Sequence, residues 1–165
     1  MERIYAPWRS GYFGSKGNEG CVFCEIAKSC ENDEANHIIY RDDYVFGVMN
    51  LYPYSPGHFM LLPYQHCDSP ESLPLEVWLH LHKLSHRAMV LLYEYGAAGI
   101  NMGLNIRKAG GAGIPEHLHL HFVPRYLGDT NFMTSIAQTR TYGIEFESVY
   151  RKIKALAQKH FTDEI

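Results

Sequence analysis

Three histidines alternate with apolar residues in one short stretch of the chain, residues 116–125, which reads EHLHLHFVPR. Successive side chains of a β-strand point to opposite faces, so the apolar residues would share one face and the histidines the other: His117, His119 and His121. Buried imidazoles need partners for their ring nitrogens. A solvated strand face and a metal-chelating tract remain the alternatives to a reactive site at this point.

The chain's length, charge and hydropathy exclude several classes of protein. Its 165 residues are enough for one domain, and a net charge of −3 provides no overall basic field for nucleic acid. No apolar run is long enough to cross a bilayer, and the first residues lack the apolar core of a signal peptide. We therefore expect a cytoplasmic protein with neither a membrane nor a nucleic acid as its partner.

Two of the four cysteines form a close pair, Cys21-Val22-Phe23-Cys24. Two thiolates three positions apart can hold one metal ion from a tight turn, and a short helix is expected to begin at Glu25. A single CxxC pair is equally compatible with redox chemistry or with two ordinary buried thiols. It favours metal or redox chemistry over a secreted disulfide framework.

The remaining pattern predicts an α+β fold. Strands are expected at residues 37–43, 44–52, 58–64 and 97–106, with the histidine stretch as the fifth, and Asp42-Asp43 as a hairpin turn. A long helix is predicted over residues 71–95, with Ser72 as its cap, Pro74 in its first turn and Gly96 at its end. Another amphipathic helix is predicted over residues 144–161. The expected architecture is a five-stranded antiparallel sheet with the long helix packed on it and a C-terminal helix.

Two polar features flank the predicted strands. Asn50 stands at a strand end, where its carboxamide can either reach a ligand hydroxyl or form an Asx-type turn with its own backbone. The loop at residues 107–116 carries Gly110, Gly111 and Gly113, whose backbone N–H groups can approach an anion closely. The same loop would also serve as a flexible connector without any function.

A neutral imidazole is a good nucleophile towards phosphorus near pH 7, and a nucleotidyl-imidazole is readily resolved by water or phosphate. Such a histidine must be held in one tautomer by a bond from its other ring nitrogen, which a neighbouring backbone carbonyl can accept. The central histidine, His119, is the natural candidate, with the outer histidines orienting phosphate oxygens or the leaving group.

The stretch HLHLHFV resembles the signature of the histidine-triad (HIT) superfamily of nucleotide hydrolases and transferases. Residues 44–66, with the tripeptide PGH, are similar to the family's strand-turn-strand, and residues 105–113 resemble its phosphate loop. The resemblance covers residues 20–125 and is greatest to the diadenosine tetraphosphate phosphorylase or hydrolase branch, because of Glu116, the segments VPR and GDTNFM, and the early APWR. It divides the chain into an arm (1–19), a HIT domain (20–128) and an extension (129–165).

The resemblance implies roles for individual residues. His119 would carry a nucleotidyl intermediate and His121 would lie near the α-phosphate. The implied nucleotide-binding residues are Asn50, Asn105, Gly111, Gly113 and His121. A structural Zn²⁺ is implied at Cys21, Cys24, His66 and His117, with Cys67 as a competing ligand. The family also implies a homodimer.

One departure concerns the residues just before the triad. Many relatives carry Ser, Thr or Gln there, whereas this chain has Gly113-Ile114-Pro115, so phosphate contact would come from backbone amides or from Arg107 or Lys108. Two other functions stay open: a metal-dependent hydrolase that uses the three histidines as ligands, and a nucleotide-binding adaptor without catalysis. The sequence leaves open whether water or phosphate is the acceptor.

Overall fold

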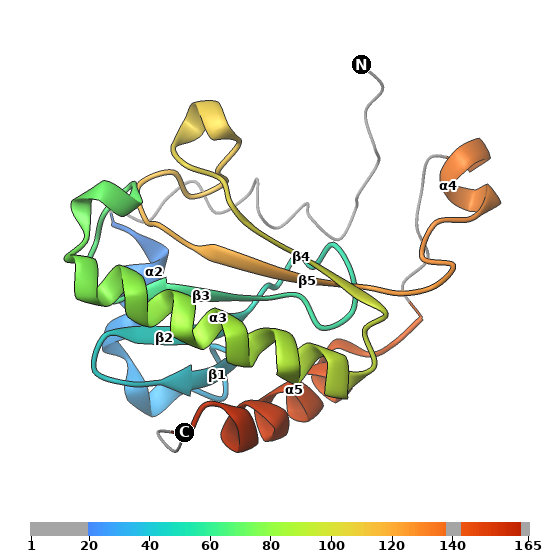
Figure 1. Ribbon diagram of the computed structural model, residues 1–165, viewed down its shortest axis with the longest axis horizontal. Helices are drawn as coiled ribbons and strands as arrows, with labels where there is room; N and C mark the ends of the chain where they lie inside the picture. Colours follow the sequence, from blue (N-terminus) through green and yellow to red (C-terminus); the bar gives the residue numbers. More distant parts are fainter. Residues whose placement is uncertain (1–19, 138–142, 163–165) are drawn as a thin grey trace.

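A computed structural model describes residues 20–137 and 143–162 of the chain, so the predicted arm at residues 1–19 lies outside the described residues. The described part is an α+β fold built on a five-stranded antiparallel sheet (Figure 1). The predicted fold class is confirmed. No helix among the described residues is both long and apolar enough to span a bilayer.

The sheet has the strand order β1-β2-β3-β5-β4. Its strands are β1 (Ile38–Arg41), β2 (Val45–Met49), β3 (Phe59–Pro63), β4 (Gly99–Leu104) and β5 (Leu120–Arg125). The helices are α2 (Val22–Lys28), α3 (Leu75–Tyr95), α4 (Phe132–Ala137) and α5 (Phe146–His160). Single 3-10 turns occur at η2 (Cys30–Asn32), η3 (Pro70–Ser72) and η4 (Lys108–Gly110).

The hairpin between β1 and β2 turns where the sequence predicts. Asp42 holds this turn, because its Oδ1 accepts hydrogen bonds from the backbone N–H groups of Tyr44 and Val45, each at 2.7 Å. His80 on α3 adds a bond from Nε2 to Asp42 Oδ2 at 2.6 Å. The turn is therefore fastened both to its own backbone and to the long helix.

Helix α3 begins four residues later than predicted. Leu73 has an extended backbone at φ −89° and ψ 148°, because the residue before a proline is disfavoured in the α region. Pro74 is consequently the N-cap and not part of the first turn, and Ser72, the predicted cap, belongs to η3. The helix ends as predicted at Gly96, whose φ of +111° suits a residue without a Cβ.

The apolar core lies between the sheet and helices α3 and α5, which pack against each other on one face (Figure 1). On that face Phe59 pairs with Phe122 and Leu61 with Leu120 across β3 and β5. The opposite face carries a second buried cluster beneath α2, which includes Phe23, Phe46, Val48, Met60 and Leu62. The sheet is thus buried on both sides in the region of the histidines.

The strand β5 begins at Leu120, so only His121 of the three histidines belongs to it. His117 and His119 precede it in an extended segment, and the N–H of Leu118 donates to the carbonyl of Cys67 at 2.7 Å. The alternation of faces still continues upstream, since Leu118 joins the core cluster with Leu120 and Phe122. The predicted strand is therefore shorter, but its side-chain pattern is as predicted.

Candidate active site and metal site

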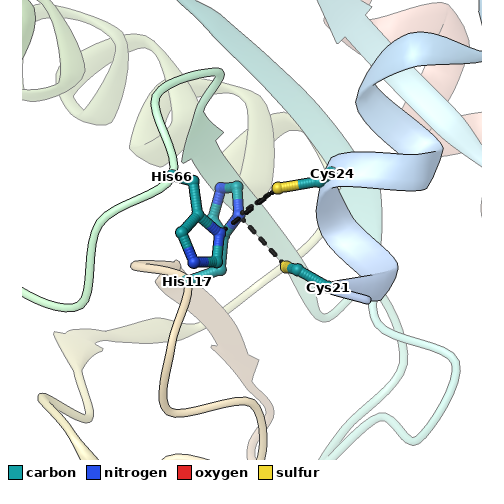
Figure 2. Close-up of side chains that lie close together, drawn as sticks. All are labelled: Cys21, Cys24, His66 and His117. Carbon is teal, nitrogen blue, oxygen red and sulfur yellow. Dashed lines mark hydrogen bonds between the residues drawn. The ribbon is translucent and has the colours of Figure 1, made fainter. Parts of the chain in front are cut away.

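Four potential metal ligands meet at the amino-terminal end of α2 (Figure 2). Cys21 immediately precedes α2 and Cys24 lies in its first turn, while His66 follows β3 and His117 approaches from the segment before β5. Their ligand atoms all lie within 4.8 Å of one another. The structure therefore brings together all four residues of the predicted zinc set.

The spacing of these atoms fits a tetrahedral ion. The Nδ1 of His117 lies 3.4 Å from the Sγ of Cys21 and 3.5 Å from that of Cys24, and the Nδ1 of His66 lies 3.3 Å from Cys24 Sγ. Tetrahedral Zn²⁺ at about 2.3 Å from sulfur and about 2.0 Å from nitrogen separates such ligands by about 3.5 Å. The donor set of two thiolates and two imidazoles also matches the preferences of zinc.

His117 is oriented toward this set by its other ring nitrogen. Its Nε2–H donates to the carbonyl oxygen of Pro63 at 2.9 Å, which leaves the lone pair on Nδ1, the atom that faces the two sulfurs. Cys67 is buried and lies outside the group of four, and burial raises the pKa of its thiol. Among the described residues, no potential metal group contains His119 or His121, so the geometry disfavours a metal held by all three histidines.

His119 is held as a neutral imidazole with one nitrogen available. Its Nδ1–H donates to the carbonyl oxygen of His117 at 2.7 Å, the kind of backbone bond that the sequence analysis expects. Burial lowers the pKa of His119 below its usual range, so the ring is unprotonated near neutral pH. No hydrogen bond from the described residues reaches Nε2, which therefore carries a lone pair open to an electrophile.

His121 is held in the opposite tautomer by a fourth histidine, His58. The backbone N–H of Tyr54 donates to His58 Nδ1 at 3.1 Å, so the proton of the neutral His58 ring is on Nε2. That Nε2–H donates to His121 Nδ1 at 3.0 Å, which places the proton of His121 on Nε2. Burial and the neighbouring His119 lower the pKa of His121 to about 4. His121 Nε2 is buried without a partner among the described residues.

The sequence alone assigns no role to His58, the last residue of the PGH tripeptide that resembles the family's strand-turn-strand. Gly57 has a φ of +89°, and a Cβ there would come within 2.9 Å of the Tyr95 ring. The signal that could have identified His58 is its spacing of two residues from Met60 on the predicted strand, which puts both side chains on one face. Since His58 directly precedes β3 and Met60 pairs with His121, its side chain falls on the histidine face.

Asn50 forms the turn bond that the sequence left as one of two alternatives. Its Oδ1 accepts from the backbone N–H of Tyr52 at 2.9 Å, and its Nδ2 lies 3.4 Å from His58 Nε2. Because His58 Nε2 is already the donor to His121, this second contact is not a regular hydrogen bond. Asn50 is half-buried beside the His58–His121 pair, so its predicted contact with a ribose stays a prediction.

The glycine-rich connection reaches the histidines from β4. Leu104, the last residue of β4, pairs with Leu120, and Asn105 directly follows it. Gly111 and Gly113 are exposed further along the loop, and their contacts with phosphate stay predictions. Arg107, by contrast, is engaged elsewhere: its Nε donates to Asp68 Oδ2 at 2.8 Å. It borders an open hollow of about 510 Å³ beside the metal set, lined by His66, Cys67, Asp68, Arg107, Pro115 and Glu116.

Alternating buried histidines at the end of a five-stranded antiparallel sheet, reached by a glycine-rich loop, define the histidine-triad class of proteins. A family model for the HIT domain matches residues 31–128. The AP-4-A phosphorylase of Mycobacterium tuberculosis is 32% identical over 150 residues, which are 85% of this chain and 76% of that protein. The chain belongs to the HIT family, as the sequence predicts.

Other relatives share less of the sequence. A bis(5'-adenosyl)-triphosphatase of Saccharomyces cerevisiae is 29% identical over 96 residues, 54% of this chain and 44% of that protein. The crystal structure of a zinc-bound histidine triad family protein from Mycobacterium smegmatis superposes with a TM-score of 0.69 at 26% identity, covering 85% of this chain and 94% of that one. These comparisons agree with the fold described above.

Proposed function

We propose that this chain is a nucleotidyl hydrolase or transferase that cleaves dinucleoside polyphosphates of the diadenosine tetraphosphate type, or adenylyl conjugates. One observation carries the proposal. The Nε2 of His119 holds a lone pair and the Nε2 of His121 holds a proton, and neither is bonded within the described part of the chain. The names of the AP-4-A phosphorylase and the bis(5'-adenosyl)-triphosphatase support this substrate class.

The proposed reaction has two displacements at the α-phosphorus. First, His119 Nε2 attacks, a P–N bond forms, and the P–O bond to the departing nucleotide breaks with its electron pair on oxygen. The Nε2–H of His121 donates a hydrogen bond to that developing charge. Second, an oxygen of water or inorganic phosphate attacks, the P–N bond breaks with its electrons returning to His119, and the proton of the acceptor passes to solvent.

The nucleotide would be held by residues around this pair. Asn50 would contact the ribose, which requires exchange of its bond with the Tyr52 N–H for one with the ligand. Asn105 would contact phosphate from its position just after β4, and the N–H groups of Gly111 and Gly113 would do so from the loop. Since Arg107 is paired with Asp68, we assign the phosphate contacts of this loop to backbone amides.

The metal set has a supporting role in this proposal. Cys21, Cys24, His66 and His117 would hold a structural Zn²⁺, since four protein ligands leave no open position for substrate. The ion would tie the start of α2 to the segment that carries His119. Thiolate ligands require reducing surroundings, which supports a cytoplasmic location.

We also propose the domain division and the assembly. Residues 20–128 would form the catalytic domain, with residues 129–165 as an extension whose α5 packs on α3 and β1. A homodimer is supported by β4, which is an edge of the sheet with Met102 44% exposed. Exposed apolar side chains on an edge strand favour pairing with a second chain.

The test is to trap and locate the intermediate. Diadenosine tetraphosphate is mixed with excess protein, quenched within milliseconds, and the adduct is mapped by peptide mass spectrometry. We expect an acid-labile adenylyl group on His119, and products whose masses with and without inorganic phosphate identify the acceptor. Turnover without any adduct on His119 would contradict the proposal.

A further inference from the structure

Phe23 connects the metal set to the proposed nucleophile. It lies between Cys21 and Cys24 in sequence and is the buried residue of α2, with 6% of its surface exposed. Its ring centroid is 5.6 Å from that of His117 and 5.4 Å from that of His119, at interplanar angles of 73° and 51°. The same short segment therefore supplies two metal ligands and a ring packed against His119.

The ring of His119 needs such a contact. Its one hydrogen bond to the described residues, from Nδ1 to the carbonyl of His117, selects the tautomer but leaves the ring able to pivot about that bond. Aromatic packing against Phe23, together with the edge contact of the His121 ring at 4.9 Å, restricts this pivot. In-line attack on phosphorus demands an oriented lone pair on Nε2, so this restriction bears on rate.

The position of Phe23 depends in turn on the cysteines. Helix α2 has only seven residues and no side-chain hydrogen bond at its N-cap, so its own helical stability is small. At its carboxyl end Arg41 donates to the carbonyls of Ile26 and Ala27, at 2.9 and 3.0 Å. At its amino end, α2 is held by the contacts of Cys21 and Cys24 with His66 and His117.

We propose that Phe23 is a positioning residue for His119, and that a metal held by Cys21 and Cys24 fixes it there. The metal set would then influence the reaction without touching a reacting atom, through the Phe23 ring and through the His117 carbonyl. This inference rests on the proposed function, since it assigns His119 as the nucleophile.

The chain offers a matched control for Phe23. Phe46 belongs to the same buried cluster and is fully buried, but its ring contacts are with Tyr64 at 5.3 Å and Arg41 at 5.7 Å. Phe23→Leu and Phe46→Leu remove the same ring from one cluster. In protein with full zinc content, we expect kcat of Phe23→Leu to fall about 10- to 100-fold with KM changed less than about threefold, while Phe46→Leu stays close to wild type.

A measurement without substrate tests directly whether Phe23 positions the His119 ring. Side-chain ¹⁵N spectra of the histidines follow the His119 ring, and we expect zinc-loaded Phe23→Leu, but not Phe46→Leu, to change its signals. Zinc removal from the wild type should change the same signals. Unchanged His119 signals together with wild-type kcat in zinc-loaded Phe23→Leu would overturn the inference. If the wild type cleaves no dinucleoside polyphosphate, the proposed function fails, while the spectra still test the Phe23 contact.

Discussion

The two faces of the segment that carries the histidines are buried to the same degree but by different chemistry. Leu118, Leu120 and Phe122 have 3%, 3% and 0% of their surface exposed, and His117, His119 and His121 have 1%, 6% and 8%. The apolar face packs into the main core and needs no partners. The histidine face needs a partner for every ring nitrogen, because a buried unsatisfied polar atom is costly.

The two nitrogens left without a protein partner identify where a ligand would bind. Both nitrogens of His117 are engaged, as is Nδ1 of the other two histidines. Only Nε2 of His119 and of His121 remain, among the described residues, and they belong to adjacent rings. The two faces are therefore equally buried but differ in their partners: the apolar face is complete within the core, and the histidine face keeps two ring nitrogens that we propose a nucleotide would contact.

The largest expected effect is on the histidine face. Replacing His119 by alanine removes the proposed nucleophile, so kcat/KM for diadenosine tetraphosphate should fall by about 10⁴-fold or more. The variant should still fold, although loss of a buried ring that contacts Phe23 and His121 should lower the free energy of unfolding by about 1–3 kcal/mol.

The matched control for this change is His82→Ala, which removes an exposed histidine of α3. Steady-state kinetics and urea unfolding on the three proteins give the comparison. If His119→Ala keeps more than a tenth of wild-type activity, the nucleophile has been assigned to the wrong ring.

The apolar face should show the reverse pattern. Phe122→Ala leaves a cavity beside Phe59, whose ring stacks on it at 5.2 Å, and should cost about 3–5 kcal/mol of unfolding free energy. The kcat per folded molecule should change little, since no reacting atom is touched. Active-site titration combined with urea unfolding measures both quantities. A large loss of kcat with small loss of stability would mean that the two faces are not separable in this way.

A smaller effect, on the histidine face alone, is a dependence of the free energy of unfolding on pH. The pKa of His121 is lowered from its usual 6.5 to about 4, so the unfolded chain binds this proton more readily than the folded one. The contribution of neutral His121 to the free energy of unfolding is therefore fully present above pH 6.5. It is lost as the pH falls toward 4, by on the order of 3 kcal/mol. Urea unfolding from pH 4 to pH 7 measures it.

Other groups titrate over the same interval, so His121→Asn is needed for comparison. The difference between wild type and variant should flatten above pH 6.5 and change below it. A difference that is constant with pH would show that His121 does not remain neutral in the fold.

The fold and the side-chain pattern of the site were accessible from the sequence because both depend on local periodicity. Alternation assigned the two faces of the histidine segment, and the apolar stripe with Gly96 gave the end of α3. The start of α3 was missed since the effect of Pro74 on Leu73 overrides the tendency of residues 71–73 to be helical. The shorter β5 was missed because a strand begins only where its neighbours pair with it. Both β3 and β4 begin to pair with β5 at Leu120, and local periodicity does not report this limit.

The contacts that were missed all join residues far apart in the chain. His58 reaches His121 across 63 positions, and Arg107 reaches Asp68 across 39. No local pattern reports such pairs, because they arise from sheet register and loop placement. The metal set spans 96 positions from Cys21 to His117, and it was found only through the resemblance to a family that shares it.

The smallest expected effect concerns the loop that leads into the histidine face. Unlike the buried histidine segment, this loop is fastened by an exposed ion pair, with the side chains of Arg107 and Asp68 57% and 42% exposed. Solvent and salt screen such a pair, so Arg107→Gln and Asp68→Asn should change KM by less than about threefold and barely alter the melting temperature. Equal small effects of the two variants would mean that the pair only fastens the loop. If Arg107→Gln raised KM strongly while Asp68→Asn did not, Arg107 would leave Asp68 to bind phosphate, and the backbone amides would not be the loop's main phosphate contacts.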